Sequence, residues 1–351
     1  MAHSEIKLKT TSGSIIYGNA WVVDEDSGVK PLANVVIAHG MAEYSFRYDK
    51  FARYLNSLGY NVYAVDQPGH GLNVTASEKP SLGLGVWPES GFKLAIDYLH
   101  ELVINVRLNM LPTILFGHSM GSFVSQRYYQ RFSDTLNGLI LCGSSANSLT
   151  FVASRRLAII MNKFMSKRKK IEPSFFFANM QTRAFNLGIK QFEDGYKSKN
   201  RWLSVNEENV QSFDKDPLCG FICSFNFYYN LFCGLKPTFQ LKRVKEITNP
   251  VPILLIAGDK DPVGSKGKGV KKLERFYRKG GQRVQCILYP NLRHEILNEK
   301  NPEKIYADVA THIEKCIKEH NDKLSHEKHN IKEDIMSVSY THLRAHETDQ
   351  Y

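Results

Sequence analysis

A serine lies between two glycines in the segment Gly117-His118-Ser119-Met120-Gly121. An apolar run, 114–117, precedes it, and a stretch of helical periodicity, 120–132, follows it. A strand, a GxSxG turn and a helix in this order are typical of a nucleophile elbow, in which the serine projects from a sharp turn at a helix amino terminus. We therefore predict that Ser119 is a nucleophile, that its flanking glycines prevent steric collisions, and that His118 supports the turn.

A serine hydroxyl needs a neighbouring base, and that base needs a carboxylate to orient it. After a nucleophile elbow, the carboxylate and the histidine follow the serine in that chain order. Asp259 and Asp261 follow one late apolar run, and His294 follows the next. We predict that His294 is the general base and that Asp261 is its acid. Asp259 would then brace the turn, and Glu295 is the weaker alternative acid.

Two backbone N–H groups are expected to stabilise an oxyanion during acyl transfer. One belongs to Met120, the residue after the nucleophile. The second should come from the loop after the apolar run 35–39, where Met41 is the predicted donor. The sequence thus predicts acyl-transfer chemistry.

Short runs rich in Val and Ile alternate with longer segments of helical period, which is typical of an α/β protein with a mostly parallel central sheet flanked by helices. Residues 6–8 and 15–23 predict an antiparallel pair at one edge of the sheet. The other predicted strands are 35–39, 62–66, 114–117, 138–142, 253–257 and 284–289, and the predicted helices are 49–58, 88–106, 120–132, 269–279 and 302–320.

This alternation stops in one long segment, residues 147–241, which has helical spacing and many aromatic side chains. We predict a helical cap inserted into a core formed by residues 1–146 and 242–322. Most of its aromatics should fill the core of the insertion itself, whereas Phe175, Phe176 and Phe177 are candidate substrate contacts.

Two further segments follow the predicted core, a charged tail at 323–337 and a stretch without hydrophobic period at 338–351. Residues 338–348, VSYTHLRAHET, resemble the translation of a sequencing-library adapter. We therefore expect residues from about 338 onward to be an artificial addition that takes no part in the fold.

Composition and charge narrow the function further. The net charge is +11, but basic residues are dispersed except at 167–170, so we expect a solvated surface and no nucleic-acid partner. The six cysteines lack CxxC spacing, which favours reduced thiols over a zinc site. No secretory signal or membrane-spanning run is visible, which predicts a cytoplasmic location.

Five motifs in order resemble the monoacylglycerol lipase and lysophospholipase group of α/β-hydrolases, of the serine aminopeptidase S33 type. They are HGMAEYSFRYDKFARYL (39–55), VDQPGHG (65–71), GHSMGS (117–122), GDKDPVG (258–264) and RHEILNE (293–299). The resemblance implies serine-ester hydrolysis without cofactor, by Ser119, Asp261 and His294. Tyr44 stands where the family commonly has His, and Gln67 or Pro68 stands where it has Arg, which concerns the choice of substrate.

The favoured function is hydrolysis of monoacylglycerol or lysophospholipid-like esters, and residues 167–170 are candidates for peripheral contact with an anionic membrane. A general carboxylesterase or an aminopeptidase is the alternative within this fold, and a non-catalytic binding module is the contrasting class. A peptidase needs a carboxylate that holds the substrate amino group. Candidates for it in the insertion are Glu172, Glu193, Asp194, Glu207, Glu208, Asp214 and Asp216.

Overall fold

The computed structural model describes residues 2–24, 28–76, 82–192 and 195–347, with the backbone alone for residue 2 and for residues 327–347. These residues form one eight-stranded sheet in the order β1-β2-β4-β3-β5-β6-β7-β8. β1 and β2 are antiparallel to their neighbours, and β3 to β8 run parallel. The strands are β1 (Ala2–Lys9), β2 (Ile15–Val22), β3 (Ala33–Ala38), β4 (Tyr60–Val65), β5 (Thr113–His118), β6 (Gly138–Cys142), β7 (Ile253–Gly258) and β8 (Val284–Tyr289).

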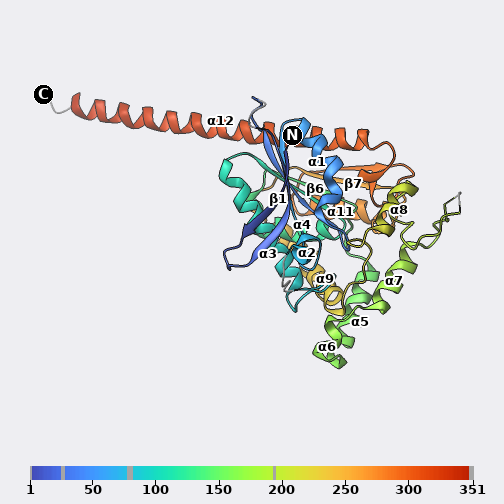
Figure 1. Ribbon diagram of the computed structural model, residues 1–351. Helices are drawn as coiled ribbons and strands as arrows, with labels where there is room; N and C mark the ends of the chain where they lie inside the picture. Colours follow the sequence, from blue (N-terminus) through green and yellow to red (C-terminus); the bar gives the residue numbers. More distant parts are fainter. Residues whose placement is uncertain (1, 25–27, 77–81, 193–194, 348–351) are drawn as a thin grey trace.

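Helices cover both faces of this sheet (Figure 1). Alternate residues of a strand point to opposite faces, so Val35 and Ile37 pack with α1 and α12, while Val36 and Ala38 pack with α3, α4 and α11. The helices outside the insertion are α1 (Asp49–Ser57), α2 (Leu72–Thr75), α3 (Gly91–Val106), α4 (Met120–Phe132), α11 (Lys268–Lys279) and α12 (Glu303–Glu347), with short 3₁₀ turns η2 (Ser45–Tyr48), η3 (Arg107–Asn109), η4 (Ser133–Thr135) and η5 (Ile296–Asn298). The predicted fold class is confirmed.

A helical region is inserted between β6 and β7 and gathers at one end of the molecule (Figure 1). Its helices are α5 (Leu149–Phe164), α6 (Lys167–Ile171), α7 (Phe175–Phe185), α8 (Glu207–Lys215), α9 (Phe225–Thr238) and α10 (Leu241–Lys245). The aromatic side chains of α7 and α9 pack on one another, with ring centroids of Phe177 and Tyr228 5.4 Å apart. The insertion therefore has apolar packing of its own.

The last helix differs from its prediction. We expected it to end near residue 320, but α12 continues as a single rod to Glu347 (Figure 1). No glycine or proline follows Pro302, so nothing in the local sequence interrupts the helix. The predicted charged tail and most of the stretch from 338 onward lie on this helix, and residues 348–351 lie outside the described residues.

Two predictions from composition can be compared with the structure. All six cysteines are free thiols in the structure. Within the described part of the chain, no helix is both long enough and apolar enough to cross a membrane.

Candidate active site

Ser119 occupies a strained turn between β5 and α4. Its backbone angles, φ 53° and ψ −120°, are rare for a residue with a side chain and place the serine at the amino terminus of α4. A Cβ at Gly121 would overlap the Ala38 carbonyl, and a Cβ at Gly117 would lie 2.8 Å from the Gly121 carbonyl oxygen. Both glycines are needed because β3 and α4 approach this turn closely.

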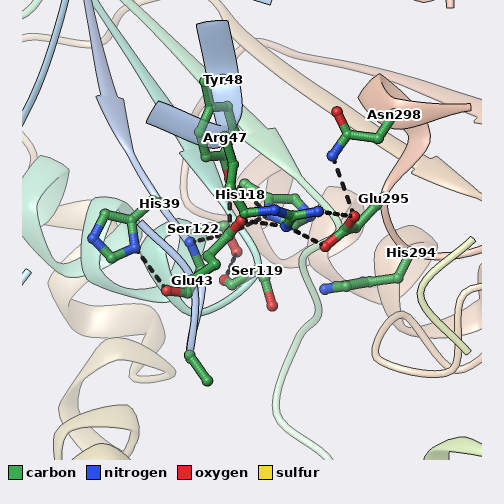
Figure 2. Close-up of polar contacts among 12 residues, drawn as sticks. His39, Glu43, Arg47, Tyr48, His118, Ser119, Ser122, His294, Glu295 and Asn298 are labelled. Carbon is green, nitrogen blue, oxygen red and sulfur yellow. Dashed lines mark hydrogen bonds and ion pairs between the residues drawn. The ribbon is translucent and has the colours of Figure 1, made fainter. Parts of the chain in front are cut away.

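Asp261 and His294 meet beside the serine, at the carboxyl ends of β7 and β8. Both side chains are buried, and His294 Nδ1 lies 3.0 Å from Asp261 Oδ1. A carboxylate only accepts hydrogen bonds, so Nδ1 carries the proton and Nε2 is left as an acceptor. Among the described residues Nε2 has no partner, and Figure 2 shows the ring of His294 extending toward Ser119 with no hydrogen bond between them.

The alternative acids lie elsewhere. Asp259 accepts a hydrogen bond from the Asn291 N–H at 2.7 Å and forms an ion pair with Lys260, so it braces the loop after β8. Glu295 follows the histidine but its carboxylate turns to Arg47 (Figure 2). Of the three candidate acids, Asp261 is the one that contacts His294.

The two predicted oxyanion donors come from two different segments next to the serine. Met120 is the first residue of α4, where backbone N–H groups have no acceptor within the helix. Met41 follows β3 in the loop 39–43, and both residues line the same cavity as Ser119 and His294. A Cβ at Gly40 would come within 3.2 Å of the Ser119 Cβ, which shows how closely this loop lies against the serine.

An apolar cavity of about 140 Å³ opens beside Ser119. This volume is roughly ten times what one water molecule needs, so the cavity has room for part of a ligand. Its wall comes from both regions of the molecule. The core contributes Gly40, Met41, Glu43, His118, Ser119, Met120, Phe123, Val263, His294 and Glu295, and the insertion contributes Thr150, Phe151, Ser154, Phe177, Met180, Gln181, Ala184, Phe185, Trp202, Leu203, Phe213, Tyr228, Leu231 and Phe232.

Only one of the three candidate phenylalanines reaches this cavity. Phe177 is 1% exposed and lines the wall, whereas Phe175 and Phe176 are 62% and 52% exposed. Consecutive residues of a helix point about 100° apart, so three adjacent phenylalanines cannot share one face. The structure therefore assigns Phe175 and Phe176 to the outer surface of α7.

Trp202 of the insertion lies against the imidazole, with the ring centroids of Trp202 and His294 5.0 Å apart. Its segment is fixed by the loop that carries the histidine. The Glu295 N–H donates to the Leu203 carbonyl at 2.7 Å, and Arg293 donates to the carbonyls of Arg201 and Ser204. Sequence reasoning missed this contact because nothing in the pattern around Trp202 indicates its partner.

Tyr44 also joins the core to the insertion. Its hydroxyl donates to Asp216 at the end of α8, over 2.9 Å, and the nearby Gly220 N–H donates to the Ala42 carbonyl. One of the two positions at which the sequence departs from its resembled family thus contacts the insertion.

A buried cluster of ionisable side chains links the loop 39–43 to His118 and to the residue after His294 (Figure 2); we call Glu43, Arg47, Tyr48, His118 and Glu295 the Arg47 cluster. Arg47 bonds both oxygens of Glu295, at 2.7 and 2.8 Å, and one oxygen of Glu43 at 2.8 Å. The other oxygen of Glu43 lies 2.9 Å from the Tyr48 hydroxyl and 3.1 Å from His118 Nδ1. His118 therefore anchors the turn, and its ring also packs on His294 at 4.9 Å.

Ion pairs within the Arg47 cluster shift the pKa values of Glu43, Glu295 and His118. Burial alone would raise the pKa of Glu43, but the hydrogen bond with His118 and the charge of Arg47 hold that pKa well below its ordinary value. Burial likewise opposes ionisation of Glu295, yet Arg47 lowers its pKa. Burial would lower the pKa of His118, and its contact with Glu43 raises it instead. The i,i+4 spacing of Glu43 and Arg47 was the one sequence signal for this cluster.

A doubly wound sheet, a serine elbow after β5 and an Asp–His pair at neighbouring strand ends define the class of the protein, an α/β-hydrolase. The chain belongs to the serine aminopeptidase S33 (Hydrolase_4) family, whose model matches residues 29–301. This is a family of lipase- and esterase-type serine hydrolases, and the predicted family is confirmed.

Relatives of the chain agree with this placement. The monoacylglycerol lipase of Mycolicibacterium smegmatis is 25% identical over 88% of this chain and 96% of its own length. Phospholipase YtpA of Bacillus subtilis is also 25% identical, over 82% and 97%. Among solved structures, a thermostable carboxyl esterase from Bacillus coagulans superposes with a TM-score of 0.79 at 26% identity, covering 90% of this chain and 99% of the esterase.

Proposed function

We propose that this chain hydrolyses carboxylic esters with an apolar acyl chain, of the monoacylglycerol or lysophospholipid type. The observation that carries the proposal is the buried Asp261–His294 hydrogen bond, together with His294 and Ser119 lining the same apolar cavity. The relatives named as a monoacylglycerol lipase and a phospholipase support this substrate class.

In the proposed reaction, Ser119 Oγ attacks the ester carbonyl carbon while His294 Nε2 takes the hydroxyl proton. Asp261 keeps the imidazole in the tautomer with a free Nε2. The oxyanion that forms accepts hydrogen bonds from the Met41 and Met120 N–H groups, each worth about 2.7–4 kcal/mol in the transition state. The bond from the carbonyl carbon to the alcohol oxygen then breaks, and His294 protonates that oxygen.

The second half of the reaction releases the acyl group. A water molecule attacks the acyl-serine ester, and His294 Nε2 takes its proton. The tetrahedral intermediate collapses to a carboxylic acid, and the proton returns to Ser119 Oγ. The side chains and backbone N–H groups named above, together with water, supply every step.

The cavity wall favours an ester over the aminopeptidase alternative. Within the described residues, its acidic side chains are Glu43 and Glu295, and both are bonded to Arg47. The described acids of the insertion do not line the cavity; Glu193 and Asp194 lie outside the described residues. A substrate ammonium would therefore displace Arg47 or stay unpaired in an apolar wall, which is costly.

The second part of the proposal concerns the surface of the insertion. α6 carries the basic run 167–170 at the tip of the insertion (Figure 1), and the neighbouring side chains of Phe164 and Phe175 are 84% and 62% exposed. Exposed aromatic and basic side chains together are typical of a surface that contacts anionic lipid. This surface would bring a lipid ester to helices that line the cavity.

The decisive test of the reaction is the variant Ser119→Ala. The wild-type chain should hydrolyse p-nitrophenyl esters and react with a fluorophosphonate probe, and the variant should do neither, with a loss of at least about 10⁴-fold in kcat. Wild-type-like hydrolysis by the variant would refute the proposed nucleophile. A wild-type chain that neither reacts with the probe nor turns over any ester would instead favour the binding module.

Sedimentation with vesicles tests the lipid surface. Reversing Lys167, Arg168 and Lys169 to Glu should reduce binding to phosphatidylglycerol vesicles, because each basic side chain near such a surface contributes about 1 kcal/mol. The matched control reverses the three basic residues of α10, which is also short and exposed. They are Lys242, Arg243 and Lys245. Equal binding by the two variants would contradict this part of the proposal.

A further inference from the structure

We propose that Arg47 is a positioning residue that holds the oxyanion loop and the base loop in register with Ser119. The oxyanion loop is residues 39–43, and the base loop is residues 290–295. The inference rests on the proposed ester hydrolysis and adds to it a residue that touches none of the reacting atoms. One buried guanidinium joins the two loops, which are about 250 positions apart in the sequence.

On the oxyanion side, Arg47 acts through Glu43. One oxygen of that carboxylate accepts the Arg47 Nη1 hydrogen bond, and the other accepts from the Gly40 N–H at 2.5 Å. Gly40 precedes Met41, whose N–H is the proposed oxyanion donor. A Glu43 carboxylate fixed by Arg47 therefore fixes the peptide that leads into the oxyanion donor, directly beside the Ser119 side chain.

On the base side, Arg47 acts through Glu295, the residue after His294. The guanidinium bonds both carboxylate oxygens, and the main-chain N–H of Glu295 donates to Leu203 at 2.7 Å. The backbone of His294 is thus fixed through both the side chain and the main chain of Glu295. Asp261 fixes the far side of the ring.

The arrangement depends on the shape of an arginine. Its planar fork can bond two carboxylates at once, whereas the compact ammonium of a lysine cannot reproduce a bidentate contact. The side chain is 10% exposed, and those of Glu43 and Glu295 are 4% and 3% exposed, so water does not replace a lost contact easily. The fork also reaches α8 of the insertion, because Nη2 donates to Asn209 and the guanidinium lies 4.8 Å from the Phe213 ring.

Steady-state kinetics of Arg47→Lys tests the proposal, because this variant retains the charge and loses the fork. Misplacement of catalytic groups by about 1 Å costs roughly 10²-fold, so kcat on a p-nitrophenyl ester should fall by about 10- to 100-fold. KM should change by less than about threefold, because the acyl cavity is made by other side chains. The matched control is Arg53→Lys, since Arg53 also contacts both oxygens of an aspartate, Asp49, but at the exposed surface.

Glu295→Gln provides an independent variant with the same shape as the wild type. It should also lower kcat with little change in KM. The double variant with Arg47→Lys should lose less than the product of the two single losses, because both changes break one contact. If Arg47→Lys does not fold by circular dichroism, Glu295→Gln alone decides the question.

The outcomes separate this inference from the proposed function. A folded Arg47→Lys or Glu295→Gln variant with wild-type kcat overturns the positioning role while leaving the hydrolase intact. A rise in KM at constant kcat overturns it as well, since it would place Arg47 in substrate binding. A wild-type chain without esterase activity overturns the proposed function itself.

Discussion

The core and the insertion meet at one cavity but contribute different kinds of contact. The core brings polar groups from the carboxyl ends of parallel strands, with Ser119 after β5 and the hydrogen-bonded pair Asp261 and His294 after β7 and β8. The insertion brings apolar side chains from helices, such as Phe177 and Phe232. Its polar contacts with the core include the hydrogen bond from the Tyr44 hydroxyl to Asp216.

This difference separates chemistry from substrate choice. Proton transfer and oxyanion binding depend on donor–acceptor distances that vary by tenths of an ångström, and adjacent parallel strands with paired backbones supply such precision. Contact with an acyl chain depends on volume and apolar area and tolerates repacking of side chains. Changes in the core should therefore alter kcat, and changes in the insertion should alter stability and chain-length preference.

The strongest test of this division is Asp261→Asn. The amide keeps the size of the carboxylate but can impose the other imidazole tautomer, so we expect kcat to fall by roughly 10⁴-fold on every ester tested. Asp259→Asn, two residues earlier, should retain most of the activity because Asp259 braces the loop at Asn291 and does not contact the base. Equal losses in both variants, measured by initial rates, would contradict the assignment of the acid.

The strands, helices and nucleophile turn of the core were predictable because each of them has a signal in its local sequence. Ser119 lies in a GxSxG turn between a strand and a helix, and β5 and α4 appear where the pattern places them. Asp261 and His294 needed only the chain order of the fold. Arg47 was not found, because the sequence shows its spacing from Glu43 but not the approach of Glu295 from the other end of the chain.

A second test replaces Phe177, a buried insertion residue, with Ala. Its ring packs against Tyr228 and Phe232, with centroids 5.4 and 5.5 Å away, so its removal should cost about 3–5 kcal/mol of the free energy of unfolding. The variant should also accept longer or bulkier acyl chains, which a panel of p-nitrophenyl esters of increasing length measures. Phe176 precedes Phe177 and is half exposed, so Phe176→Ala should cost less than about 1 kcal/mol and leave the preferences in the ester panel unchanged.

The insertion resisted prediction for a physical reason. Three adjacent phenylalanines on α7 point in three directions, so helical periodicity does not indicate which of them is buried. The side chains that bury Phe177 come from α9, about 50 residues later. Its exposed neighbours differ from it only in their tertiary surroundings. Helix existence in the insertion follows from composition, whereas the identity of the cavity wall depends on how the helices pack together.

The smallest expected effect is that of replacing Trp202. This side chain belongs to the insertion but packs on the imidazole of His294, which belongs to the core. The aromatic contact with His294 is worth about 0.5–1.5 kcal/mol, so Trp202→Leu should lower kcat/KM by roughly 2- to 10-fold. Trp202→Phe keeps an aromatic face and should recover most of the loss. If the effect lies in kcat, the insertion orients the base as well as the substrate. If the effect lies in KM alone, the core by itself determines the chemical steps, and Trp202 contributes to substrate binding only.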